Sequence, residues 1–172
     1  VFYFIVGQGA SFFQPEQRKR DKLLWKKTLK GIVTNPIIIG IAAGLAGKIT
    51  TPEGRIESTL IVSPPRCGKT TLVRDLVRTL SERGYIIGVC DERSEIAGMR
   101  DGVPSFDIGA NTDVMDACPK ASGMLMLLRS MGPDVIVTDE IGKVEDIEAI
   151  ESVLLAGVSI IATIHGAGRR DI

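Results

Sequence analysis

The chain has 172 residues, of which 44% are hydrophobic and 24% charged, a balance typical of one globular domain with a real core. Its 21 basic and 21 acidic side chains give a formal net charge of zero, so the overall charge provides no general attraction to nucleic acid. Three widely spaced cysteines (Cys67, Cys90 and Cys118) match neither a disulfide framework nor a metal-ligand spacing, which is typical of a reducing cytosol.

Residues 1–48 form a segment of uncertain fold. Basic residues cluster between Arg18 and Lys30 among leucines and a tryptophan. This pattern suits either a basic amphipathic helix that faces a membrane or partner, or the solvated face of a helix leading into the core. The apolar run at 37–46 is shorter than the roughly 20 residues that a membrane helix needs, so no spanning segment is expected. The turn signal at 51–54 predicts a hairpin between Gly47–Thr50 and Arg55–Val62.

A phosphate-binding loop is predicted between the apolar run 59–62 and a helical pattern that starts near Lys69. In this arrangement the free N–H groups of the helix N-terminus cradle a polyphosphate. Lys69 would reach the β- and γ-phosphates, and the Thr70 hydroxyl would ligate Mg²⁺. An unrelated Gly-Lys-Thr turn is the alternative, and the flanking strand and helix argue against it. The predicted nucleotide-binding residues of the loop are Ser63, Pro64, Pro65, Arg66, Cys67, Gly68, Lys69, Thr70 and Thr71.

Two residues in this loop are unusual. Ser63 stands where the motif has its first glycine, and a small residue there still permits the turn. Cys67 lies inside the loop, where it is either an oxidation-sensitive thiol or simply a small side chain.

After the loop, helices and strands alternate. The pattern predicts a helix from Lys69 to about Ser81, a strand at 85–90, a loop at 98–112, a helix at 119–131, a strand at 134–138, a helix at 144–156 and a strand at 158–164. Such alternation predicts an α/β fold with a mostly parallel sheet and helices on both faces. Ligands of such sheets bind at the carboxyl ends of the strands, so the residues that follow each strand are the candidates for chemistry.

The strand at 134–138 is followed by two acids, Asp139 and Glu140, as in a Walker B element. Asp139 would hold Mg²⁺ through water, and Glu140 would polarise the attacking water, a role that needs a carboxylate within hydrogen-bond reach. A strand that merely ends in a capping acid pair is the alternative, and the preceding phosphate loop argues against it.

Two other strand ends carry polar groups. Asp91, Glu92 and Arg93 follow one strand, and His165, which is the only histidine, follows the last. A lone histidine is usually structural, but one at this end of the sheet is placed to contact a γ-phosphate or to act as a switch that relays nucleotide state. The catalytic candidates are therefore Lys69, Glu140 and His165.

These residues resemble the secretion-ATPase superfamily of type II and type IV systems. The resemblance is carried by Arg129–Glu140 and by Ala162–Gly166, and the Asp box and His box of the superfamily correspond to 91–93 and to the stretch at His165. The resemblance is closer still to the family of stage III sporulation AA proteins of endospore-forming Firmicutes. It is carried by 63–71, 91–98 and 112–121, with Gly123–Met124 and Arg129–Met131 in addition.

The resemblance spans 49–168 and implies a RecA-like P-loop ATPase core at 49–172, cut short at its C-terminal end. It also implies ATP and Mg²⁺ as ligands, with Asp91, Glu92 and Arg93 near the nucleotide and Thr70 and Asp139 near the metal. The implied assembly is a cytoplasmic homo-hexamer, peripheral to a membrane-associated secretion-like channel of the sporulation apparatus, with no nucleic acid partner.

Three departures from the family are visible. Residues 1–35 do not resemble the family's N-terminal domain, and Asn111 stands where relatives usually carry arginine. The chain ends just past the last predicted strand. Because sheets of this class usually supply a further strand there, beside the phosphate-loop strand, we expect the latter to be a sheet edge unless the hairpin covers it.

Other functional classes remain open. A small P-loop GTPase would show an Asn-Lys-x-Asp motif, which the sequence lacks. A P-loop kinase would need an acceptor site, and Glu140 beside Asp139 favours water as the acceptor. A nucleotide-gated assembly module that binds ATP with little or no hydrolysis is the non-enzymatic alternative.

Overall fold

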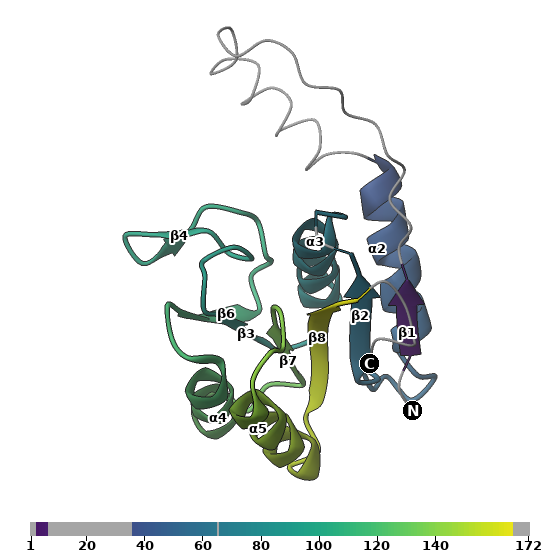
Figure 1. The fold of residues 1–172 in the computed structure, drawn as a ribbon. Helices are drawn as coiled ribbons and strands as arrows, with labels where there is room; N and C mark the ends of the chain where they lie inside the picture. The colour runs from purple at the N-terminus through teal and green to yellow at the C-terminus, as the bar shows by residue number, and fades with distance from the viewer. Residues whose placement is uncertain (1–2, 7–35, 65, 167–172) are drawn as a thin grey trace, which may run out of the picture.

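The computed structural model describes residues 3–6, 36–64 and 66–166, with side chains from Gly40 onward (Figure 1). The strands of the main sheet are β1 (Tyr3–Val6), β2 (Thr59–Ser63), β3 (Ile87–Asp91), β6 (Thr112–Asp116), β7 (Val135–Thr138) and β8 (Ser159–His165). The helices are α2 (Pro36–Ile49), α3 (Lys69–Glu82), α4 (Lys120–Ser130) and α5 (Val144–Leu155). A small antiparallel pair, β4 (Met99–Arg100) and β5 (Val103–Pro104), stands apart from the sheet.

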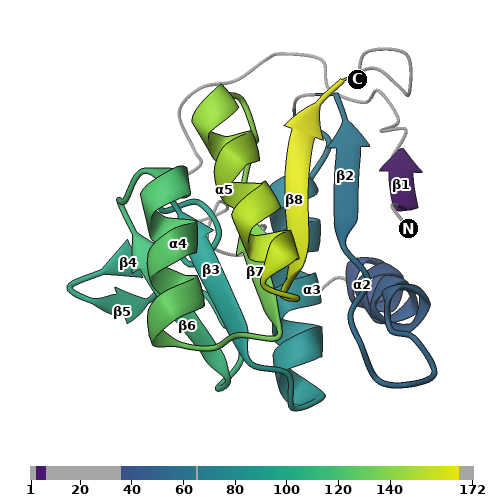
Figure 2. The same ribbon diagram turned by 90° about the horizontal axis from the view of Figure 1, so that it is seen from below.

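The main sheet is six-stranded, in the order β1-β2-β8-β7-β3-β6, and each strand pairs in parallel with its neighbours. Helices α2 and α3 lie together on one face, and α4 and α5 cover the other (Figure 2). The α/β fold predicted from the sequence is confirmed. The basic cluster between Arg18 and Lys30 lies outside the described residues.

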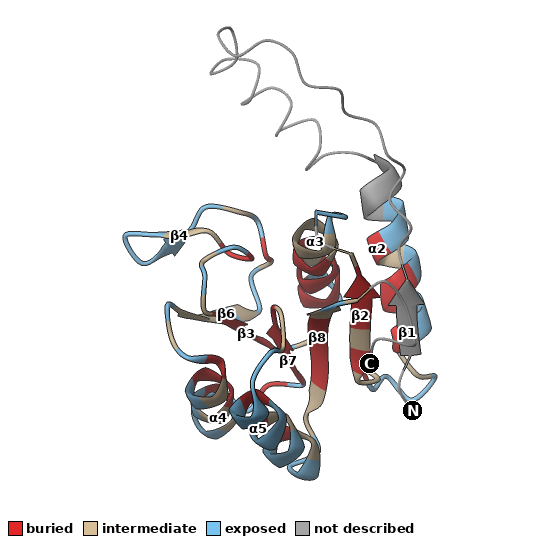
Figure 3. Ribbon diagram, viewed as in Figure 1, coloured by how far each residue is buried: buried red, intermediate tan, exposed pale blue. Residues whose placement is uncertain are grey.

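The central strands are buried on both faces (Figure 3). Successive side chains of a strand point to opposite faces, so one continuous apolar run supplies two cores. In β7, Val135 and Val137 join the core beneath α2 and α3, and Ile136 joins the core beneath α4 and α5. In α3, residues such as Leu76 and Leu80 recur at helical spacing and are fully buried. Burial on both faces holds the strands in one fixed register.

The N-terminal side of the chain contributes more to this sheet than the sequence predicted. The expectation that the phosphate-loop strand β2 is a sheet edge is wrong, because β1 pairs with it from Tyr3↔Thr59 to Val6↔Val62. The hairpin predicted between Gly47–Thr50 and Arg55–Val62 is also wrong in extent, because the structure has a single bridge there, Thr50↔Ile56.

Helix α2 contains the apolar run at 37–46. It packs on α3 through Leu45, Ala46 and Ile49, which are buried in the same core as Leu76. In the part of the chain that the structure describes, no helix is long and apolar enough to cross a membrane. The domain boundary near residue 48 stays a prediction.

Strand β6 was missed by the sequence analysis. It pairs with β3 from Ile87↔Thr112 to Asp91↔Asp116 and forms the other edge of the sheet. Its residues are half-buried or exposed, and only Val114 and Met115 among them are apolar. An edge strand with so little apolar surface lacks the pattern that reveals the central strands.

Close packing of α4 on β3 yields a stability prediction. A methyl group added at Gly123 would lie 2.5 Å from the buried Cys90 Sγ, far inside contact distance. We expect Gly123→Ala to lower the free energy of unfolding by about 1–3 kcal/mol, the usual cost of overpacking a core. Urea unfolding measures the loss, and Ser122→Ala, at the exposed neighbouring position, is the control. Adding Cys90→Ala should restore stability; a Gly123→Ala variant as stable as its parent would contradict this packing.

Candidate nucleotide-binding site

A polar cavity of about 390 Å³ lies at the carboxyl ends of the parallel strands. It is lined by 66–71 of the phosphate loop, Arg93 and Glu95 after β3, Asp139 and Glu140 after β7, and Thr163 and His165 of β8. The parallel register brings these segments together, because Ser63 at the end of β2 pairs with His165 at the end of β8. This is where an open α/β sheet binds its ligand.

The loop between β2 and α3 presents a free helix N-terminus to the cavity. Gly68 is the N-cap residue, with φ of 81°, a left-handed conformation that glycine adopts without steric cost. Its carbonyl accepts the first helical hydrogen bond from Leu72 N at 3.0 Å, and no side chain caps the helix. The first N–H groups of α3 therefore remain available to an anion, as in phosphate-binding loops.

Lys69 is held inside this loop. Its Nζ donates to the carbonyls of Ser63 at 2.9 Å and Pro64 at 3.1 Å, and it lies 2.8 Å from His165 Nδ1. Burial lowers the pKa of the Lys69 ammonium, while the charges of Cys67 and Glu140 act in the opposite direction. These three contacts use all the donors of an ammonium group, so a phosphate oxygen must replace one of them.

His165 connects Lys69 to Glu140. An ammonium can only donate, so Nδ1 accepts from Lys69 and the proton of a neutral ring is on Nε2. Nε2 lies 3.2 Å from Glu140 Oε2, and Arg93 lies 3.4 Å from the same oxygen. The three candidates for catalysis thus form one chain of contacts, from Lys69 through His165 to Glu140.

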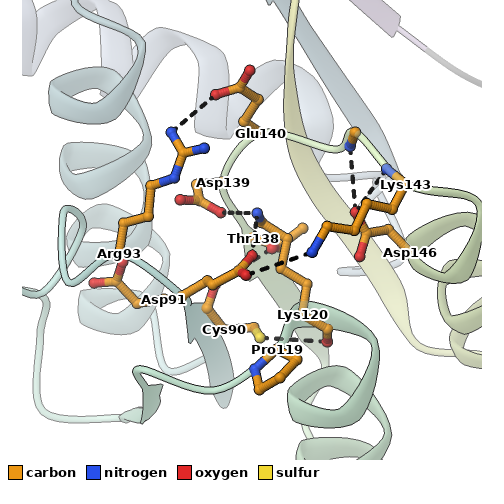
Figure 4. A network of polar contacts seen from close by, with 12 residues as sticks. Cys90, Asp91, Arg93, Pro119, Lys120, Thr138, Asp139, Glu140, Lys143 and Asp146 are labelled. Atoms are coloured by element: carbon orange, nitrogen blue, oxygen red, sulfur yellow. Dashed lines mark hydrogen bonds and ion pairs between the residues drawn. The ribbon is translucent and has the colours of Figure 1, made fainter.

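Asp139 faces a buried lysine that the sequence analysis missed. Lys120 Nζ lies 3.1 Å from Asp139 Oδ1, an ion pair whose geometry falls short of a hydrogen bond (Figure 4). The same nitrogen donates to Glu92 Oε2 at 2.8 Å. Burial raises the pKa of the Asp139 carboxyl, and Lys120 opposes the rise. Burial acts to lower the pKa of Lys120, but Glu92 and Asp139 outweigh it and the net shift is upward.

The available donors fit Mg²⁺. The Thr70 hydroxyl and the Asp139 carboxylate both line the cavity and are hard oxygen ligands. Magnesium in phosphate-binding sites usually takes one or two protein ligands and completes its shell with phosphate oxygens and water. Within the described ranges, no group of three or more His, Cys, Asp or Glu could hold a metal ion.

Comparison with known proteins identifies the family. The sequence model for sporulation stage III, protein AA matches residues 19–172. The chain belongs to this family. It is 50% identical over 121 residues to stage III sporulation protein AA of Bacillus subtilis (strain 168), covering 67% of this chain and 39% of that protein. It is 34% identical over 113 residues to the uncharacterized protein ycf45 of Porphyra purpurea, covering 64% of this chain and 20% of that protein.

The fold of this family member also resembles a solved ATPase. The X-ray structure of the Legionella pneumophila ATPase DotB matches 73% of this chain and 36% of its own, with a TM-score of 0.50 and 18% identity. The predicted RecA-like P-loop fold is confirmed by this likeness and by the sheet described above.

The structure separates the residues of the predicted Asp box. Arg93 lines the cavity, whereas Asp91 and Glu92 do not. Asp91 is fully buried, and its carboxylate accepts hydrogen bonds from the N–H groups of Glu95 (2.9 Å), Ile96 (3.0 Å) and Ala97 (2.9 Å). The structure gives Asp91 a role in shaping the loop after β3, and Glu92 is occupied by Lys120.

Arg74 of α3 holds the other side of this loop. It donates to the carbonyls of Ile96 and Glu95, both at 2.7 Å, and its guanidinium lies 3.5 Å from the centre of the Phe106 ring. The loop thereby carries Glu95 to the cavity wall. Neither Glu95 nor Thr163 was singled out from the sequence, because neither directly follows a strand.

Asn111 lies far from the cavity. Its side-chain amide donates to the carbonyl of Ser81 at 3.2 Å, near the C-terminal end of α3, whereas the cavity lies at the N-terminal end of that helix. Asn111 is therefore not among the residues that line the cavity.

Asp91 provides a direct test of its structural role. Asp91→Ala would leave three backbone N–H groups without acceptors, and we expect the free energy of unfolding to fall by about 3 kcal/mol. Thermal and urea unfolding would measure this, with Asp113→Ala, at the exposed position of β6, as the control. Unchanged stability together with lost ATP binding would instead make Asp91 a nucleotide ligand, as the sequence predicted.

Proposed function

We propose that this chain is the core of an ATPase that binds Mg·ATP and hydrolyses it. The observation that carries the proposal is the single cavity that gathers the phosphate loop, both Walker B acids and His165. The chain spans 39% of its Bacillus subtilis relative, so the role of the whole protein is part of the proposal.

The phosphate-loop residues would bind the nucleotide. The free N–H groups at the start of α3 would receive the β-phosphate, and Lys69 would exchange its contact with His165 for a γ-phosphate oxygen. The His165 side chain is 41% exposed, which leaves it room to turn. Thr70 and Asp139 would hold Mg²⁺, which supplies charge neutralisation on the phosphates.

Glu140 would orient and polarise the attacking water. It stands beside Arg93 and His165 at the cavity wall, within reach of the space above the phosphate loop. His165 touches both Lys69 and Glu140, so a change at the γ-phosphate would alter the environment of the base. This gives His165 the role of relaying nucleotide state.

The proposed biological role is that of an assembly or motor ATPase. It would work in the cytoplasm as a homo-hexamer, peripheral to a membrane-associated secretion-like channel of the sporulation apparatus. Membership of the stage III AA family and the fold shared with DotB support this proposal. A nucleotide-gated assembly module with little hydrolysis is the second candidate, and it is favoured by the contacts of Glu140 with Arg93 and His165, which already engage the carboxylate that would act as the base.

Lys69→Ala tests nucleotide binding. The loop should lose the cation that reaches the terminal phosphates, so we expect ATP affinity to fall at least tenfold and hydrolysis to vanish. Titration with a fluorescent ATP analogue would measure affinity. The control is Lys143→Ala, which removes a 66% exposed lysine outside the cavity lining. ATP hydrolysis by Lys69→Ala at the parent's rate would contradict the assignment of the phosphate loop.

Glu140→Gln separates hydrolysis from binding. The amide keeps the shape but cannot act as a base, so turnover should fall by roughly 10²-fold or more while Mg·ATP affinity stays near that of the parent. Phosphate release and ATP affinity are measured side by side, with Glu145→Gln, at an exposed position of α5, as the control. A parent that binds ATP but releases no phosphate would support the assembly module, and an equal loss of affinity and rate would make Glu140 a metal ligand.

A further inference from the structure

Lys120 occupies a place where a lysine is normally unfavourable. It is the first residue of α4, where the helix dipole repels a cation, and its side chain is only 6% exposed. No acidic residue lies in the first turn of α4 to offset this charge. The compensation comes instead from two acids that follow other elements, Glu92 after β3 and Asp139 after β7. Such an arrangement indicates a function beyond holding α4 in place.

The two contacts fix the ammonium in one position. Glu92 accepts a hydrogen bond from Lys120 Nζ at 2.8 Å, and this contact directs the ammonium toward Asp139. The Asp139 Oδ1 atom is fully buried and lies 3.1 Å from Lys120 Nζ. Figure 4 shows the other oxygen of Asp139 turned away from Lys120. Because the Asp139 side chain also lines the cavity, one oxygen is held by protein and the other remains for a ligand.

We propose that Lys120 is a positioning residue that orients Asp139 as a ligand for nucleotide-bound Mg²⁺. This inference rests on the proposed function of the cavity. Groups that hold a metal ligand in place contribute strongly to metal binding, and their loss typically costs 10–100-fold in affinity. The opposite effect is the natural rival, since an ammonium next to Asp139 could compete with Mg²⁺ for the carboxylate. The two differ in the sign of the change when Lys120 is removed.

Lys120→Met tests the inference. The Mg²⁺ concentration for half-maximal binding of a fluorescent ATP analogue is measured at fixed protein and nucleotide, and Mn²⁺ binding with the same nucleotide is followed by electron paramagnetic resonance. We expect the Mg²⁺ midpoint to rise at least tenfold and Mn²⁺ affinity to fall equally. Nucleotide affinity in EDTA should stay within twofold of the parent, because Lys120 does not line the cavity.

The chain offers a matched control in Lys143. It lies 3.9 Å from Glu92 Oε1 and is 66% exposed, so Lys143→Met removes a lysine charge near the same acid without touching Asp139. Its Mg²⁺ midpoint should stay within twofold of the parent. A midpoint for Lys120→Met that equals that of Lys143→Met would show a merely structural lysine, and a lower midpoint would show a competitor; either result overturns the proposal.

Two further variants keep the test decisive. If Lys120→Met does not fold, Glu92→Gln decides, because it weakens the contact that aims the ammonium; it should raise the Mg²⁺ midpoint, and an unchanged midpoint overturns the proposal. Combining Lys120→Met with Asp139→Asn should give no larger shift than Asp139→Asn alone, since Lys120 acts through Asp139. A parent chain without Mg²⁺-dependent ATP binding would refute the proposed function itself, a result distinct from a failed shift.

Discussion

The parallel pairing of the central strands is the constraint on which the whole site depends. β2, β8, β7 and β3 lie side by side and point the same way, so the residues at their carboxyl ends lie close together. Burial on both faces fixes the register, because a slip by one residue would exchange the two cores. The pair Ser63↔His165 is a consequence of that register, and it brings the only histidine to the phosphate-loop lysine.

Charges of both signs alternate around the carboxyl ends of these strands. Lys69, Arg93 and Lys120 each lie close to a carboxylate or to the carbonyls of the loop. Ion pairs in partly buried sites carry a desolvation penalty, so they are weak evidence that the pair stabilises the fold and stronger evidence of a functional role. Their arrangement here keeps Asp139 and Glu140 on separate partners, Lys120 for one and Arg93 with His165 for the other.

The sequence predicted those parts of the site that obey a local rule. The phosphate loop, Asp139, Glu140 and His165 lie at or directly after the ends of apolar strands, and the structure brings them together. The partners of Lys120 are far away in the chain, so no local pattern reveals its role. The residues of β1 are apolar, but the sequence does not show which strand they pair with. A lysine at the start of a helix without an acid in its first turn was the one available signal.

The stretch 91–98 contains residues that shape the loop after β3 and residues that line the cavity. Asp91 holds the N–H groups of the loop and Arg74 holds its carbonyls, so the backbone is fixed from both sides. Gly98 completes the arrangement: a methyl group there would lie 2.6 Å from the Phe106 ring, which in turn stacks on Arg74. These contacts hold the loop in one conformation. Two of its charged residues, Arg93 and Glu95, reach the cavity. Within 91–98, Asp91 and Gly98 therefore shape the loop, and Arg93 and Glu95 between them line the cavity.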